Sequence, residues 1–153
     1  MSTLHDFLVT ATRNAAEQLV PAIGRIPEDK RDWIPAGKAR TALDLYAECI
    51  ILNGYTAEMI QTRTWSQENF ESYGADKEKI YGMTPEERQT ALLGSVEKVV
   101  EAIVPVPDDA LTVLIEMPWG AQTLAEICAY PYWNMSYHTG QINYIASILE
   151  CLD

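Results

Sequence analysis

The chain has 153 residues, of which 48% are hydrophobic, and its 22 acidic and 11 basic side chains give a formal net charge of −11. This length suffices for one domain with its own core and is too short for two, so residues 1–153 are expected to form a single domain. The basic residues form no cluster, which argues against nucleic acids and anionic membrane surfaces as partners. No apolar run approaches the roughly 18 residues of a membrane span.

The cysteines indicate a reducing compartment. Cys49, Cys128 and Cys151 are odd in number, widely spaced and free of any CxxC pair. They are therefore expected to be reduced thiols of a cytoplasmic protein. The first residues lack the basic start and apolar block of a signal peptide, which supports the same expectation.

Four segments begin with a threonine that is followed three residues later by a carboxylate. In this capping pattern the hydroxyl accepts a hydrogen bond from a free N–H of the first helical turn, and the acid reaches back to the cap. The four patterns are Thr3–Asp6, Thr41–Asp44, Thr84–Glu87 and Thr123–Glu126. Each opens a segment of periodic apolar residues, so we predict four main helices. Their approximate ranges are residues 3–23, 41–63, 84–104 and 123–150.

The connections between these helices are long. Residues 24–40 contain two prolines and mixed charges and are expected to form an ordered connection anchored by Trp33. Residues 64–83 are polar and predict a long loop, or a loop with a short helix. Residues 112–117 have a β-like composition that could form a short strand or hairpin. Four amphipathic helices without alternating strands predict an all-α four-helix bundle with long inter-helix connections.

Polar residues interrupt the apolar stripes of the second and fourth helices. The stripe of the fourth helix, with residues alternately three and four apart, consists of Leu124, Ile127, Pro131, Asn134, His138, Gln141, Ile145 and Ile148. Such a stripe should face a core. In the second helix, Glu48 has a leucine one turn to either side. We therefore expect Glu48, Asn134 and His138 to converge inside the bundle.

This polar layer has two interpretations. A carboxylate and an imidazole can both ligate a divalent transition metal. Alternatively, Glu48 pairs with His138 or stays protonated, and Asn134 supplies hydrogen bonds that fix helix register. A ferritin-type di-iron site requires two Glu-x-x-His motifs, and the only histidines are His5 and His138. We expect His5 to be a solvated residue of a first helical turn.

The last helix also carries a group of aromatic residues: Tyr130, Tyr132, Trp133, Tyr137 and Tyr144. They favour packing or a homodimer face, with ligand binding as the alternative. No Gly-rich phosphate loop, Gly-x-Ser-x-Gly turn or Cys/His dyad is present.

Several segments resemble the DinB-like superfamily, four-helix bundles that include metal-dependent hydrolases and thiol S-transferases. The matching segments are residues 31–35, Thr41–Glu48, Trp119–Glu126 and His138–Ile142, and the last of these, His-Thr-Gly-Gln-Ile, is the specific one. The resemblance implies a metal site of three histidines, one on the second helix and a pair four residues apart on the last helix. Those positions are Glu48, Asn134 and His138 in this chain. Tyr55 and Gln141 would be the hydrogen-bond acceptors that orient imidazoles there.

Only His138 keeps the histidine of that pattern, and the neutral amide of Asn134 is a poor ligand for zinc or nickel. We therefore predict that no metal is held tightly and that the bundle binds a small molecule or a protein. The alternative implied by the resemblance is a hydrolase or thiol S-transferase in which zinc or nickel activates a water or a thiol.

Overall fold

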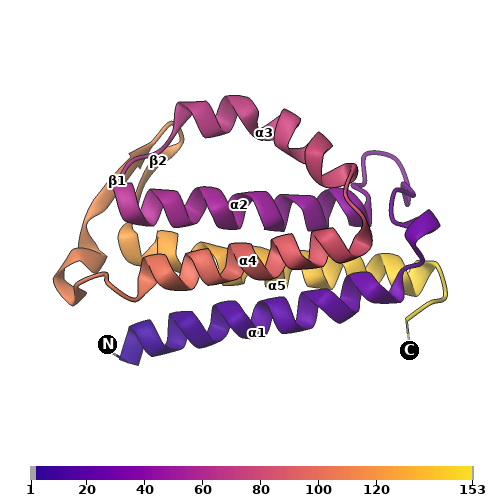
Figure 1. The fold of residues 1–153 in the computed structure, drawn as a ribbon, viewed down its shortest axis with the longest axis horizontal. Helices are drawn as coiled ribbons and strands as arrows, with labels where there is room; N and C mark the ends of the chain where they lie inside the picture. Colours follow the sequence, from indigo (N-terminus) through magenta and orange to yellow (C-terminus); the bar gives the residue numbers. More distant parts are fainter. Residues whose placement is uncertain (1–2, 153) are drawn as a thin grey trace.

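Five α-helices and one β-hairpin make up residues 3–152, the part of the chain that the computed structural model describes (Figure 1). The helices are α1 (Thr3–Arg25), α2 (Ala42–Thr62), α3 (Gln67–Tyr81), α4 (Pro85–Ile103) and α5 (Leu124–Ile148), the strands are β1 (Leu114–Met117) and β2 (Gly120–Thr123), and the short 3-10 helices are η1 (Glu28–Lys30) and η2 (Asp108–Thr112). The predicted all-α bundle is confirmed, and its four predicted helices correspond to α1, α2, α4 and α5. Within residues 3–152 no helix has the combination of length and apolarity needed to cross a membrane.

Threonine side chains cap three of these helices as predicted. The hydroxyls of Thr41, Thr84 and Thr123 accept hydrogen bonds from the backbone three residues on. At Thr84 and Thr123 the carboxylate also bonds back to the cap, which completes a capping box. Thr3 is already helical, and any cap before it lies outside the described residues.

Consecutive helices α1 and α2 are not close neighbours in the bundle. Instead α1 packs mainly on α5, whereas α2 packs on α4 and α5. The connection between α1 and α2 therefore crosses the end of the bundle, and Trp33 within it packs against the core as predicted. The core includes side chains such as Leu19, Met135 and Ile142, which are fully buried between these helices.

Helix α3 is additional to the four predicted helices. Its segment was expected to form a long loop, or a loop with a short helix. It is a 15-residue helix capped by Ser66, whose hydroxyl accepts from the backbone N–H of Asn69. Figure 1 shows α3 running beside α2, on the side away from α1. Ile80 is its one buried residue. Its sequence therefore lacks the apolar periodicity by which the other helices were predicted.

The β-hairpin joins η2 to α5. Its strands pair antiparallel, with Met117 opposite Gly120 across the two-residue turn that contains Trp119. Gly120 has a φ of +128°, a backbone conformation that residues other than glycine rarely adopt. The turn brings the Trp119 ring to 6.0 Å from that of Trp65, which precedes α3. The hairpin thus closes one end of the space between α2, α3 and α5.

His5 is not solvated, contrary to the expectation. It is 1% exposed, and its Nε2 lies 2.6 Å from the carbonyl oxygen of Val106. Its Nδ1 lies 3.3 Å from a carboxylate oxygen of Asp108. The segment that follows α4 passes over the first turns of α1, a contact across 101 residues that no local pattern indicates.

Candidate functional site

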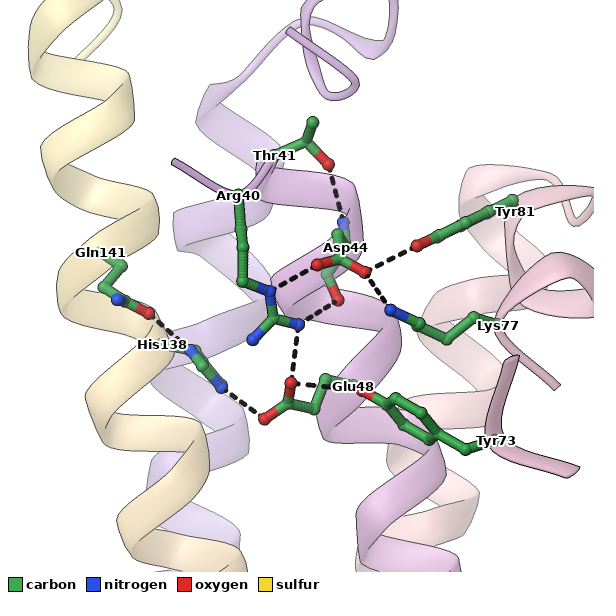
Figure 2. Close-up of polar contacts among 9 residues, drawn as sticks. All are labelled: Arg40, Thr41, Asp44, Glu48, Tyr73, Lys77, Tyr81, His138 and Gln141. Carbon is green, nitrogen blue, oxygen red and sulfur yellow. Dashed lines mark hydrogen bonds and ion pairs between the residues drawn. The ribbon is translucent and has the colours of Figure 1, made fainter. Parts of the chain in front are cut away.

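The first turns of α2 position a row of charged side chains. Asp44 and Glu48 are four residues apart in α2 and lie on one face of its first turns, and Arg40 lies just before the N-cap residue Thr41. Nη2 of Arg40 lies 2.6 Å from Oε2 of Glu48, and its Nε donates to Oδ2 of Asp44 at 2.5 Å. One guanidinium thus joins both carboxylates (Figure 2).

The last helix, α5, supplies the imidazole. Nε2 of His138 lies 2.9 Å from Oε1 of Glu48, and Nδ1 lies 2.6 Å from Oε1 of Gln141. Each ring nitrogen therefore faces an oxygen, to which it donates when it carries a proton. The structure confirms that Glu48 and His138 are neighbours, although they are 90 residues apart in sequence.

Helix α3 completes the charge network from the other side of α2. The Tyr73 hydroxyl donates to Oε2 of Glu48 at 3.2 Å. Lys77 Nζ and the Tyr81 hydroxyl each lie 2.7 Å from Oδ1 of Asp44. We define the Arg40 network as these residues together: Arg40, Asp44, Glu48, Tyr73, Lys77, Tyr81 and His138.

The Arg40 network holds its carboxylates in the charged form. Burial by itself would raise the pKa of Glu48, but the hydrogen bond from His138 and the charge of Arg40 outweigh it and lower that pKa to about 2. Burial is likewise outweighed at Asp44, where the bonds from Arg40, Lys77 and Tyr81 lower the pKa to about 2. Burial would lower the pKa of Arg40, but the two carboxylates raise it. The network is therefore a set of mutually compensated charges at neutral pH.

The three other residues of the predicted site, Gln141, Tyr55 and Asn134, differ from one another in their contacts. Gln141 contacts His138 as an acceptor, as expected for that position. The Tyr55 hydroxyl instead bonds Ser72 and Asp76 of α3. Asn134 is 2% exposed, and its Nδ2 has no hydrogen-bond partner within residues 3–152.

A transition metal does not fit this donor set. Both oxygens of Glu48 already face positive or proton-donating groups, and the Arg40 guanidinium 2.6 Å away would repel a second cation. Asn134 offers no charge, and catalytic zinc sites usually have three good protein ligands. Across residues 3–152 no group of three or more His, Cys, Asp or Glu side chains has a metal-binding arrangement. The contacts suit an ion-pair network instead.

A cavity of about 600 Å³ adjoins Glu48. We call it the aromatic cavity, because seven of its lining side chains are aromatic. These seven are Tyr55, Trp65, Phe70, Tyr73, Trp119, Tyr130 and Trp133. The Leu52 and Met59 side chains of α2 and Met117 of the hairpin extend its apolar wall. The stripe of α2 that carries Glu48 therefore faces this cavity.

The aromatic residues of α5 separate into different environments. Tyr130 and Trp133 line the aromatic cavity with their rings 5.8 Å apart. Tyr132 packs on Phe7 of α1. Tyr137 and Tyr144 are 53% and 70% exposed. Their predicted role in a homodimer face stays a prediction.

Sequence reasoning found Glu48, His138 and Gln141 but missed most of the Arg40 network. The four-residue spacing of Asp44 and Glu48 was a usable signal, because it places two carboxylates on one face of α2 and Arg40 lies just before that helix. Nothing in the sequence indicated Tyr73, Lys77 or Tyr81, since their segment was predicted as a long loop, or a loop with a short helix, and not as the 15-residue helix α3.

Comparison with known proteins shows the fold. No family model and no curated protein sequence matches the chain. Among solved structures, a DinB-like protein from Bacillus subtilis (YjoA) superposes with a TM-score of 0.70 and 13% identity, covering 94% of this chain and 92% of that one. Mycothiol-dependent maleylpyruvate isomerase superposes with a TM-score of 0.65 and 14% identity. A mutant of that enzyme gives a TM-score of 0.63 and 15% identity. This chain spans 63% of the isomerase's length. The chain thus has the DinB-like fold, as its sequence predicted.

Proposed function

We propose that this protein binds a small organic molecule in the aromatic cavity, without a metal ion. The observation that supports this proposal most is the cavity itself, which has a volume of about 600 Å³ and is bounded by α2, α3, α5 and the hairpin. Small-molecule sites typically measure roughly 300–1,000 Å³ and combine apolar and aromatic walls with a few polar groups. Here the polar groups include Glu48 and Tyr73, which the Arg40 network holds in place.

The network supports binding better than metal-assisted catalysis. Ion pairs that are already satisfied fix the orientation of side chains but leave no open coordination position. A metal-dependent hydrolase or thiol S-transferase is the alternative, and the likeness to a thiol-dependent isomerase supports it through the fold alone. Zinc- or nickel-dependent conjugation of a small thiol to a reactive aryl halide, lost in His138→Ala, would favour this alternative.

Tryptophan fluorescence can test the binding proposal directly. Three of the four tryptophans, Trp65, Trp119 and Trp133, line the cavity. Titration with naphthylmethanol, a neutral aromatic probe, should therefore change the emission in a saturable manner. Isothermal calorimetry should give one site per chain.

A matched pair of variants locates the bound probe. Leu52→Trp adds bulk to the cavity wall and should weaken binding at least about tenfold. Leu93→Trp makes the same change on α4, at a side chain that is 44% exposed and outside the cavity lining. It should bind the probe as the wild type does. No saturable binding by the wild type, or equal binding by both variants, would contradict the proposal.

A further inference from the structure

We infer that the ligand of the aromatic cavity is an organic cation, an ammonium group on a compact apolar body. This inference rests on the proposed function and specifies its ligand class. The cavity lining includes two carboxylates, Glu48 and Glu58, and contains no Lys, Arg or His side chain among the described residues. A pocket for an anion normally offers a positive side chain or several free N–H groups, so this lining selects against negative charge.

The two carboxylates differ in how their charge is balanced. Glu48 is compensated by Arg40 at 2.6 Å and faces His138 at 2.9 Å. Glu58 accepts a hydrogen bond from the Asn69 amide at 2.9 Å. It forms no ion pair with any Lys, Arg or His side chain of residues 3–152. Glu58 therefore contributes an uncompensated negative charge at the cavity wall.

Aromatic rings line the same cavity as Glu58. Asn69, the partner of Glu58, immediately precedes Phe70, whose ring centroid lies 5.9 Å from that of Trp65. Trp65 in turn contacts Trp119 of the hairpin at 6.0 Å. The faces of such rings carry partial negative charge and attract cations, and tryptophan does so most strongly. The rings and Glu58 thus favour the same sign of ligand charge.

The charge of the whole chain acts in the same direction. A net charge of −11 produces a negative potential that attracts cations and repels anions over distances of a Debye length. Neutral apolar molecules gain nothing from this potential. Of the three charge classes, a cation is the one that the cavity wall, the rings and the overall charge all favour.

Three probes of nearly equal shape separate charge from shape: naphthylmethylammonium, naphthylmethanol and naphthoate. Calorimetry at pH 7 and low salt should give tightest binding to the cation, roughly tenfold tighter than to the alcohol, with the anion weakest. Raising the salt concentration should reduce the advantage of the cation, because salt screens the charge of an exposed carboxylate.

Matched charge variants then assign the preference to Glu58. Glu58→Gln keeps the side-chain shape and should weaken binding of the cation several-fold more than binding of the alcohol. Glu101→Gln makes the same change on α4, outside the cavity lining, and should bind all three probes as the wild type does. Circular dichroism checks that both variants are folded.

The outcomes distinguish the two proposals. If none of the three probes binds, the proposed function fails and this inference fails with it. If the alcohol binds as tightly as the cation, or the anion binds best, the charge inference fails while the binding function stands. A cation preference that Glu58→Gln leaves intact would overturn the role given to Glu58.

Discussion

His138 Nε2 of α5 lies 2.9 Å from Glu48 Oε1 of α2, and this contact joins two helices whose contacting residues are 90 positions apart in the sequence. The carboxylate also meets Arg40, so it keeps one partner when the other is removed. The energetic weight of each partner can therefore be measured separately.

His138→Ala should lower the free energy of unfolding by about 1–3 kcal/mol, because it removes a partner of the largely buried Glu48 carboxylate and leaves space in the core. Urea denaturation at pH 7 measures the change. Ser136→Ala on the exposed face of α5 is the control and should stay within about 0.5 kcal/mol. A double-mutant cycle with Glu48→Gln should give a coupling energy of roughly 1 kcal/mol or more, and strictly additive effects would contradict a stabilising Glu48–His138 contact.

Glu48 and Asp44 should make the protein sensitive to acid. Their folded-state pKa of about 2 lies below the ordinary values of 4.5 and 3.8. A depressed carboxyl pKa contributes stability that is fully present above the ordinary value and is lost as the pH falls toward 2. Glu48→Gln should therefore be less stable than the wild type at pH 7, and the difference should shrink between pH 5 and pH 2. Urea denaturation across this range measures both proteins, and a pH-independent difference would contradict the assignment.

Metal binding should require restoring the imidazoles. The wild type should show no stoichiometric binding of zinc or nickel in a calorimetric titration at neutral pH, because Arg40 pairs with Glu48 and Asn134 is neutral. Glu48→His combined with Asn134→His supplies two further nitrogen ligands and should bind zinc or nickel. Tight binding by the wild type would favour the metal-dependent enzyme. A folded double variant that binds neither metal would show that the three positions do not converge.

Helix α3 should open more readily than the rest of the bundle. Only Ile80 of this helix is buried, and much of its attachment to α2 is polar, through contacts such as that of Lys77 with Asp44. Hydrogen exchange should therefore be faster in α3 than in α2 and α5. Asp44→Asn weakens the contacts of Lys77 and Tyr81 and should accelerate exchange in α3 more than in α5.

A surface variant provides the comparison for this experiment. Glu97→Gln breaks an exposed ion pair with Arg13, away from α3, and should leave exchange in α3 unchanged. Equal protection of α3 and α5 in the wild type would show that polar contacts hold α3 as firmly as the core holds α5.

The three thiols should react in a fixed order. Cys49 and Cys128 are fully buried, whereas Cys151 is partly exposed near the end of the chain. Burial raises the pKa of Cys128 to about 11 and raises that of Cys49 further, so neither thiolate is available at pH 8. A disulfide reagent should consume one thiol quickly and the others only on unfolding, and Cys151→Ser should remove the fast phase. Rapid reaction of three thiols in the native protein would contradict this burial.

The bundle was predictable because its signals are local. Thr84 and Thr123 form the capping boxes that their sequences predicted, and the apolar stripe of α5 is buried at Leu124, Ile127 and Ile145. The helix α3 was less predictable, since a polar helix with one buried residue has no periodic signal. Its stability depends on tertiary contacts, which the sequence of that segment alone does not reveal.

Some residues of the candidate site were likewise predictable from the sequence, and others were not. Glu48 and His138 stood out because polar residues on apolar stripes require partners. Tyr73 and Lys77 did not stand out, because long polar side chains on a helix surface can pair with many neighbours or with water. The prediction that His5 is solvated was wrong for a similar reason, since its partner Val106 belongs to a distant segment. Sequence patterns therefore revealed the polar pair that lies on two apolar stripes, Glu48 and His138, but not the polar contacts made by α3 or by the segment after α4.

The position of Arg40 has a consequence for how the charge of Glu48 is maintained. A metal ion dissociates when its free concentration falls well below its dissociation constant, and a chelator then removes it. A guanidinium attached to the same chain cannot be diluted, and its effective concentration beside the carboxylate is set by the fold. Charge compensation at Glu48 is therefore independent of the supply of trace metals, and the cavity beside it keeps its electrostatic character in metal-starved surroundings.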